Sequence, residues 1–238
     1  MLVAAAVCPH PPLLVPEVAA GAAEETAGLR AACHAAVDSL YEAAPDLVVV
    51  VGDAPATGPY PAGLLGTFAG FGVPREVVLG AAPDALTSDV LPLSLAVGAW
   101  LLESAPADPP CRGYGVSATA SSTAAAAIGV QLAAQADRVA LLVMGDGSAR
   151  RTEKAPGALD PRAADFDAAV ATALAAADCD TLLDVDPVLA ADLLAVGRAS
   201  WQVLAGAAWG VGWDAEVTYD EAPYGVGYLV ATWRRTPA

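Results

Sequence analysis

Polar residues that could do chemistry follow three apolar stretches of this 238-residue chain. His10 stands between prolines after the first stretch, Asp53 follows four consecutive valines, and Asp146 follows the third stretch. A histidine combined with carboxylates can bind a metal ion or transfer protons, so the chemistry to expect is metal-dependent or acid–base. Taken alone, each residue is more often structural: a solvated loop histidine, or an aspartate in a turn or helix cap.

The segment MGDGSARRTEKAPGALDPRAADFD (144–167) looks like the edge of an active site, because a long loop follows a buried strand. Asp146 and Ser148 are its candidate catalytic residues, whereas Ala149 beside them has no side-chain chemistry. Neither GxxxxGK[ST] nor GxGxxG occurs around it, so it is not a phosphate loop. A triad could be drawn from Ser148 and His10, but the nucleophile elbow GxSxG is missing, which argues against that chemistry.

The chain contains only two histidines, which limits the metal sites it can build. His34, the second one, lies five residues after Leu29, and we expect it on the solvated side of its helix. An iron site with two histidines and one carboxylate needs two imidazoles. Only His10 is well placed to supply one.

Apolar patterns predict the elements that position these residues. The stretches at 2–7, 48–51 and 138–144 are apolar at nearly every position, which is typical of strands covered on both faces in a mostly parallel sheet. Strand and helix patterns alternate, so we expect a single α/β domain over 1–238, with a mostly parallel central sheet flanked by helices. The other predicted elements are a helix at 22–44 with Leu29, Cys33, Ala36, Val37 and Leu40 on its apolar face, an irregular strand or hairpin at 64–78, a helix at 88–104, a strand at 111–118, helices at 121–136 (N-cap Ser121), 160–177 (N-cap Asp160), 184–196 and 199–208, and paired strands at 215–219 and 225–233.

In open α/β sheets, ligands bind outside the carboxyl ends of the strands. If the three apolar strands are parallel, then His10, Asp53, Asp146 and Ser148 converge on one edge of the sheet. We expect Glu221, with Asp220 beside it, in the turn between the last two strands. The sequence thus predicts one polar edge as the functional site.

Composition limits the partners of the chain. Hydrophobic residues make up 56% and charged residues 16%, which indicates a globular domain with a sizeable core. The net charge of −16 excludes nucleic acid and anionic membranes as partners, and no segment has the pattern of a membrane span or signal peptide. We therefore expect a cytoplasmic protein, with a homo-oligomer left open. The four cysteines form no CxxC pair, which predicts reduced thiols in or near the core: Cys8, Cys33, Cys111 and Cys179.

Four segments together resemble one known family: CPHPPLLVPEV (8–18), VVVVGDAP (48–55), the loop at 144–167 and EAPYGVGYLV (221–230). In this order and spacing they are similar to the class III extradiol ring-cleavage dioxygenases, the LigB-type or DODA-type proteins, and most of all to a small uncharacterised bacterial branch. The resemblance spans almost the whole chain. It implies the α/β fold of that family and a small aromatic molecule as the binding partner.

The resemblance also implies a non-haem Fe(II) site. In that family the iron is held by a histidine after the first strand, a second histidine after the next core strand and a late glutamate. Another histidine, in a motif like Gly-Asp-x-Ser-His, acts as the acid/base. The ligand positions fall on His10, Asp53 and Glu221 of this chain, and the acid/base position falls on Ala149.

Two of these positions depart from the family pattern. A carboxylate in place of a histidine at Asp53 favours Mn²⁺, Mg²⁺ or Zn²⁺, although such a site can still hold Fe(II). The alanine at 149 removes a proton-transfer group, which typically contributes roughly 10²–10⁴-fold in rate. Ring cleavage by the family mechanism should therefore be severely slowed.

Three hypotheses follow. The first is a divergent class III extradiol dioxygenase-like protein with an altered or lost metal site, which binds a ligand or runs a different reaction around His10, Asp53, Asp146 and Glu221. The second is an active Fe(II)-dependent dioxygenase that opens a catechol-type ring. The third is a structural or interaction protein that uses the fold as a scaffold. Two histidines are too few for the three histidine roles of the family, which favours the first hypothesis.

Overall fold

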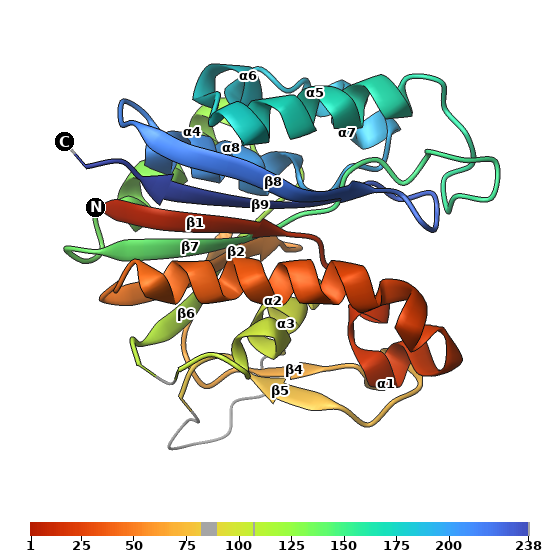
Figure 1. The fold of residues 1–238 in the computed structure, drawn as a ribbon, viewed down its shortest axis with the longest axis horizontal. Helices are drawn as coiled ribbons and strands as arrows, with labels where there is room; N and C mark the ends of the chain where they lie inside the picture. Colours follow the sequence, from red (N-terminus) through yellow and green to blue (C-terminus); the bar gives the residue numbers. More distant parts are fainter. Residues whose placement is uncertain (82–89, 107, 238) are drawn as a thin grey trace.

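A seven-stranded sheet forms the centre of the computed structural model, which describes residues 1–81, 90–106 and 108–237. The strand order is β3-β6-β2-β7-β1-β9-β8 (Figure 1). The four middle strands are parallel to one another, and the outer three pair antiparallel. The sheet is thus parallel at its centre, as expected, and mixed overall. Its strands are β1 (Leu2–Cys8), β2 (Leu47–Asp53), β3 (Gly58–Tyr60), β6 (Cys111–Val116), β7 (Val139–Met144), β8 (Trp213–Glu221) and β9 (Tyr228–Arg235).

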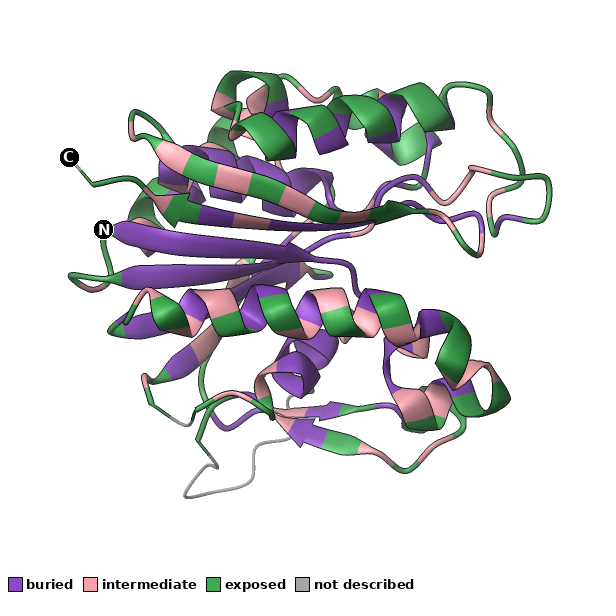
Figure 2. Cartoon of the chain, in the orientation of Figure 1, coloured by how far each residue is buried: buried purple, intermediate pink, exposed green. Residues whose placement is uncertain are grey.

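Helices cover both faces of this sheet, and Figure 2 shows the middle strands buried between them. Alternate side chains of one strand point to opposite faces, so Val49 packs into one hydrophobic cluster and Val50 into the other. This is why an uninterrupted apolar run, rather than an alternating one, forms the central strands. One face is covered by α2 (Ala27–Glu42) and α3 (Leu93–Leu102), and the other by α4 (Ser122–Ala133), α5 (Ala163–Ala176) and α8 (Arg198–Ala208).

Shorter elements complete the fold. The irregular segment predicted at 64–78 is a hairpin, in which β4 and β5 pair antiparallel. These elements are β4 (Leu65–Thr67), β5 (Glu76–Val78), the helices α1 (Pro16–Ala19), α6 (Cys179–Leu183) and α7 (Pro187–Asp192), and the 3₁₀ helices Pro12–Leu14, Ala20–Thr26 and Ala69–Phe71.

Several helix predictions are confirmed in detail. The buried residues of α2 are the five predicted for its apolar face, although this helix begins at Ala27 because a 3₁₀ helix precedes it. Ser121 caps α4, since its hydroxyl accepts the N–H of Ala124 at 3.2 Å. The helix predicted at 88–104 is α3, which begins after Pro92; residues 88 and 89 lie outside the described residues.

Other predictions are wrong. The segment predicted as one helix at 184–196 contains only the shorter α7, which begins after Asp186 because this residue caps it by accepting the N–H of Val188 at 2.8 Å. The helix predicted from residue 160 begins at Ala163. Glu221 ends β8 instead of lying in the turn, and the short strand β3 was not predicted because its sequence, Gly-Pro-Tyr, has no apolar pattern.

The cysteines are all free thiols, as predicted, and three of them are buried: Cys8, Cys33 and Cys111. Within the described ranges, none of the helices combines the length and the apolar character that crossing a membrane would require.

Candidate functional site

A cleft of about 530 Å³ opens at the carboxyl edge of the sheet. The parallel strands β1, β2 and β7 end there together, so His10 and Asp53 reach the same space from two different strands. We call it the carboxyl-edge cleft. Its lining consists of His10, Asp53, Ala54, Pro55, Pro92, Leu93, Ser94, Ser117 and Ala118.

His10 is held at this edge by Asp146. The side chain of Asp146 accepts the main-chain N–H of His10 at 2.7 Å, and its Oδ1 lies 3.6 Å from the His10 Nδ1. Strands β1 and β7 are also joined here, because the N–H of Gly145 donates to the Cys8 carbonyl at 2.9 Å. His10 is only 7% exposed, and its Nδ1 has no hydrogen-bond partner among the described residues. A buried polar atom without a partner calls for an explanation, and a bound ligand is one such explanation, although four other buried side-chain atoms in the described ranges share this property.

Asp53, the last residue of β2, supplies the carboxylate of the cleft. Its main-chain carbonyl accepts the hydroxyl of Ser94 at 2.6 Å, which ties the end of β2 to the first turn of α3. Burial raises the pKa of Asp53, while a charge on His10 and the Ala54 N–H act in the opposite direction. None of the ion pairs within the described ranges includes this carboxylate.

The loop after β7 is fastened to the start of β9. The Gly147 N–H donates to the Gly227 carbonyl at 2.7 Å, and the Gly227 N–H donates to the Ser148 carbonyl at 2.9 Å. Ser148 is fully buried, and its hydroxyl donates to the Leu193 carbonyl at 3.1 Å. Ser148 does not line the cleft, so it is not placed for the catalytic role that we expected. Its contacts hold the loop in place instead.

Asp167 is a fastening residue that the sequence patterns did not indicate. Its carboxylate, only 1% exposed, accepts the N–H of Ser148 at 2.7 Å and pairs with Arg151 at 2.9 Å. Burial raises the pKa of Asp167, and these two donors oppose that shift. A Cβ at Gly147 would lie 2.7 Å from the Asp167 Oδ1, so this close approach requires glycine. In the sequence, Asp167 cannot be distinguished from other polar residues of α5. The one signal that could have indicated it is the pair of glycines, Gly147 and Gly227, that its carboxylate approaches closely.

Glu221 lies outside the cleft. It is exposed at the end of β8, where its carboxylate accepts the hydroxyl of Tyr219 at 3.2 Å. Three strands separate β8 from β2, so the backbones at Glu221 and Asp53 are four strand spacings apart, roughly 19 Å. The part of the chain that the structure describes contains no group of three His, Cys, Asp or Glu side chains placed to hold a metal ion. The expected ligand set of His10, Asp53 and Glu221 is therefore not brought together, and these residues do not fit the implied iron site.

The second histidine also lies away from the cleft. His34 packs against Trp100 with ring centroids 5.5 Å apart, and its Nδ1 lies 3.3 Å from the Ser104 hydroxyl. It is half-buried, not fully solvated as expected, and burial lowers its pKa. It cannot serve as a second ligand beside His10, because it does not line the cleft.

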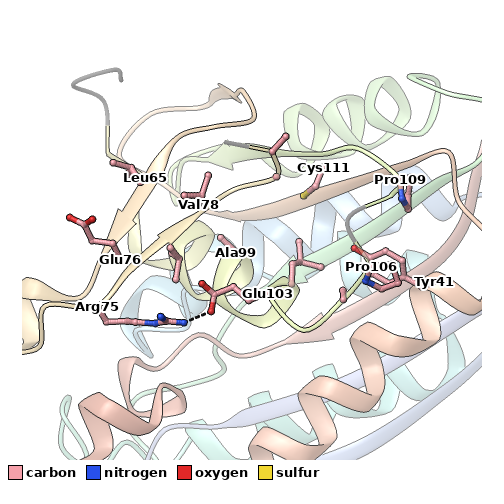
Figure 3. A pocket seen from close by; sticks show the side chains of 15 residues that line it. Tyr41, Leu65, Arg75, Glu76, Val78, Ala99, Glu103, Pro106, Pro109 and Cys111 are labelled. Carbon is pink, nitrogen blue, oxygen red and sulfur yellow. Dashed lines mark hydrogen bonds and ion pairs between the residues drawn. The ribbon is translucent and has the colours of Figure 1, made fainter. Parts of the chain in front are cut away.

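A larger cavity, of about 650 Å³, lies at the other end of α3 (Figure 3). The first turn of α3 lines the carboxyl-edge cleft, whereas Leu102 and Glu103 at its last turn line this cavity. Its arginine, Arg75, pairs with Glu103, as the dashed line in Figure 3 marks. Burial raises the pKa of both Tyr41 and Cys111 to about 12, so these groups are neutral at pH 7. We call this space the large cavity.

Comparison with known proteins supports the fold alone. No family model and no curated protein matches the chain. Among solved structures, it is similar to the uncharacterized protein JW3007 from Escherichia coli K12, with a TM-score of 0.53 and 13% sequence identity. That similarity covers 98% of this chain and 99% of the other, so the same α/β architecture extends over both.

Proposed function

We propose that the chain is a divergent protein of the class III extradiol dioxygenase type that no longer cleaves rings and binds a small molecule in the carboxyl-edge cleft. One observation carries this proposal: Glu221 is separated from His10 and Asp53, so the expected three ligands do not meet. The alanine at 149, in the position of the acid/base histidine, is a second departure in the same direction.

The spatial arrangement of the four segments supports the resemblance. The segment at 8–18 meets the loop at 144–167 where His10 donates to Asp146. That loop in turn meets the segment at 221–230, where the Arg151 N–H donates to the Gly225 carbonyl at 3.0 Å. The segment at 48–55 shares the cleft with the first segment, since Asp53 and His10 both line it. The four segments are thus neighbours at one edge of the sheet, which is where ligands bind in such folds.

The groups that remain in the cleft can bind a ligand. The imidazole of His10 and the carboxylate of Asp53 can form hydrogen bonds with a ligand. The hydroxyls of Ser94 and Ser117 can also accept hydrogen bonds. The apolar residues of the lining provide the walls that exclude water.

Elemental analysis tests the proposal. The protein is purified without a metal-binding tag, loaded with Fe²⁺ under anaerobic conditions, dialysed, and analysed for iron, manganese and zinc. We expect far less than one ion per chain, and no ring-opened product from a panel of catechols. Near-stoichiometric metal that is lost in His10→Ala and retained in the control His34→Ala would contradict the proposal. Catechol cleavage by that metal-loaded protein would establish the active Fe(II) dioxygenase instead.

A further inference from the structure

Within the described ranges, the carboxylate of Asp53 forms no ion pair, and its attraction to a charged His10 is not a direct contact. None of the ion pairs between described residues reaches it, and the lining of the carboxyl-edge cleft contains no lysine or arginine. Arg198 contacts the carbonyl of Ala118, a lining residue, but its guanidinium is committed to that carbonyl, to the Ala120 carbonyl and to Gln202. A carboxylate that is partly withdrawn from water and unpaired is costly, and a bound cation lowers that cost.

A second observation points to a ligand in the same place. His10 lines the cleft, is more than nine-tenths buried, and has an Nδ1 without a hydrogen-bond partner in the described part of the chain. Its neighbour Asp146 is already engaged, since it accepts the His10 main-chain N–H. A ligand that enters the cleft therefore meets the Asp53 carboxylate and the His10 imidazole, whereas the hydroxyls of Ser94 and Ser117 are already bonded to the Asp53 carbonyl and to Thr119.

Charge decides which ligand these groups prefer. An anion in the cleft would lie beside Asp53, with Asp146 behind His10, on a protein whose net charge is −16. A cation would be attracted both by the field of the whole protein and by the unpaired carboxylate. A metal ion is a poor candidate, because no third ligand joins His10 and Asp53 among the described residues. An organic cation needs only one counter-ion and apolar walls, and the cleft supplies both.

We propose that the carboxyl-edge cleft binds a small organic cation, with an ammonium group facing Asp53 and its carbon skeleton against the apolar walls. This inference rests on the proposed function and names the chemical class of its ligand. A cleft of about 530 Å³ holds a molecule of the size of a phenylalkylamine. A catecholate anion, in contrast, would be repelled.

Three molecules of one shape but different charge test this inference: 2-phenylethylamine, 2-phenylethanol and phenylacetate. Binding is followed by NMR titration of the full chain. We expect the amine to bind at least about tenfold more tightly than the alcohol, since a charge-assisted hydrogen bond supplies the difference, and phenylacetate not to bind. Asp53→Asn should reduce the affinity for the amine to that for the alcohol. The control Asp38→Asn removes an exposed charge on α2 and should change nothing.

Each other result overturns the inference. Phenylacetate binding as well as the amine would exclude a cation site, and undiminished amine binding in Asp53→Asn would place the cation elsewhere. Failure of all three molecules to bind would also reject this ligand class. The unfolding temperature of Asp53→Asn verifies its fold, since the Asp53 carbonyl that holds Ser94 is unchanged. Metal analysis of the same preparations distinguishes the two proposals. Bound metal that is lost in His10→Ala would contradict the proposed function. A metal-free protein that binds phenylacetate more tightly than the amine would contradict only the ligand class.

Discussion

The two cavities at the ends of α3 differ in how their charges are satisfied. The larger one pairs Arg75 with Glu103, and its thiol and phenol are neutral at pH 7, although the buried Arg75 Nε has no hydrogen-bond partner among the described residues. In the smaller one, the carboxyl-edge cleft, Asp53 forms no ion pair with a described residue, and the buried His10 Nδ1 has no hydrogen-bond partner among them either. Volume alone would favour the large cavity as the binding site. The lack of an ion pair at Asp53 within the described residues favours the cleft, because a carboxylate that is partly withdrawn from water is costly to keep without a partner.

The largest effect should come from the contacts that hold the loop after β7. Asp167→Ala removes a buried carboxylate and leaves the Ser148 N–H and the Arg151 guanidinium without their acceptor. We expect the free energy of unfolding to fall by about 3 kcal/mol. Chemical denaturation measures this. Asp165→Ala, on an exposed position of the same helix, is the control and should change stability little; equal losses in the two variants would mean that the Asp167 contacts are not what holds the loop.

That residue also marks the limit of prediction from the sequence. The apolar runs predicted the middle strands, because burial on both faces is a local pattern. The rule that parallel strands end at the same edge of the sheet then predicted that His10, Asp53 and Asp146 lie there. The position of Glu221 depends on strand order, which local patterns do not encode: β8 lies at the far side of the sheet. The burial of Ser148 and Asp167 arises from packing between distant segments, which no spacing in the sequence records.

A smaller effect is expected at the large cavity. Glu103→Gln removes the partner of Arg75 but keeps the size of the side chain. Because the side chain of Glu103 is 37% exposed, we expect a loss of at most about 1 kcal/mol, decreasing at high salt. Thermal unfolding at low and high ionic strength tests this. An increase in stability would show that the ion pair between Arg75 and Glu103 is unfavourable. The two cavities would then not differ in whether their charges have partners.

The smallest effect has the opposite sign and is the sharpest test of the contrast. Burial raises the pKa of Asp53 in the folded protein, so its charged form opposes folding at pH 7. Asp53→Asn should therefore slightly increase the free energy of unfolding, since solvent screens the charge of this half-buried group. A raised folded pKa contributes stability that is complete below the unfolded pKa, about 3.9, and is lost as the pH rises through the folded value. The advantage of the variant should accordingly be present at pH 7 and shrink as the pH falls toward 4.

Denaturation of both proteins across that range measures the difference, and a variant less stable than the wild type at pH 7 would mean that Asp53 already has a partner in the protein. A gain, together with the loss in Glu103→Gln, would show that the cleft retains an unfavourable charge where the large cavity does not, which is what a binding site awaiting a cation requires.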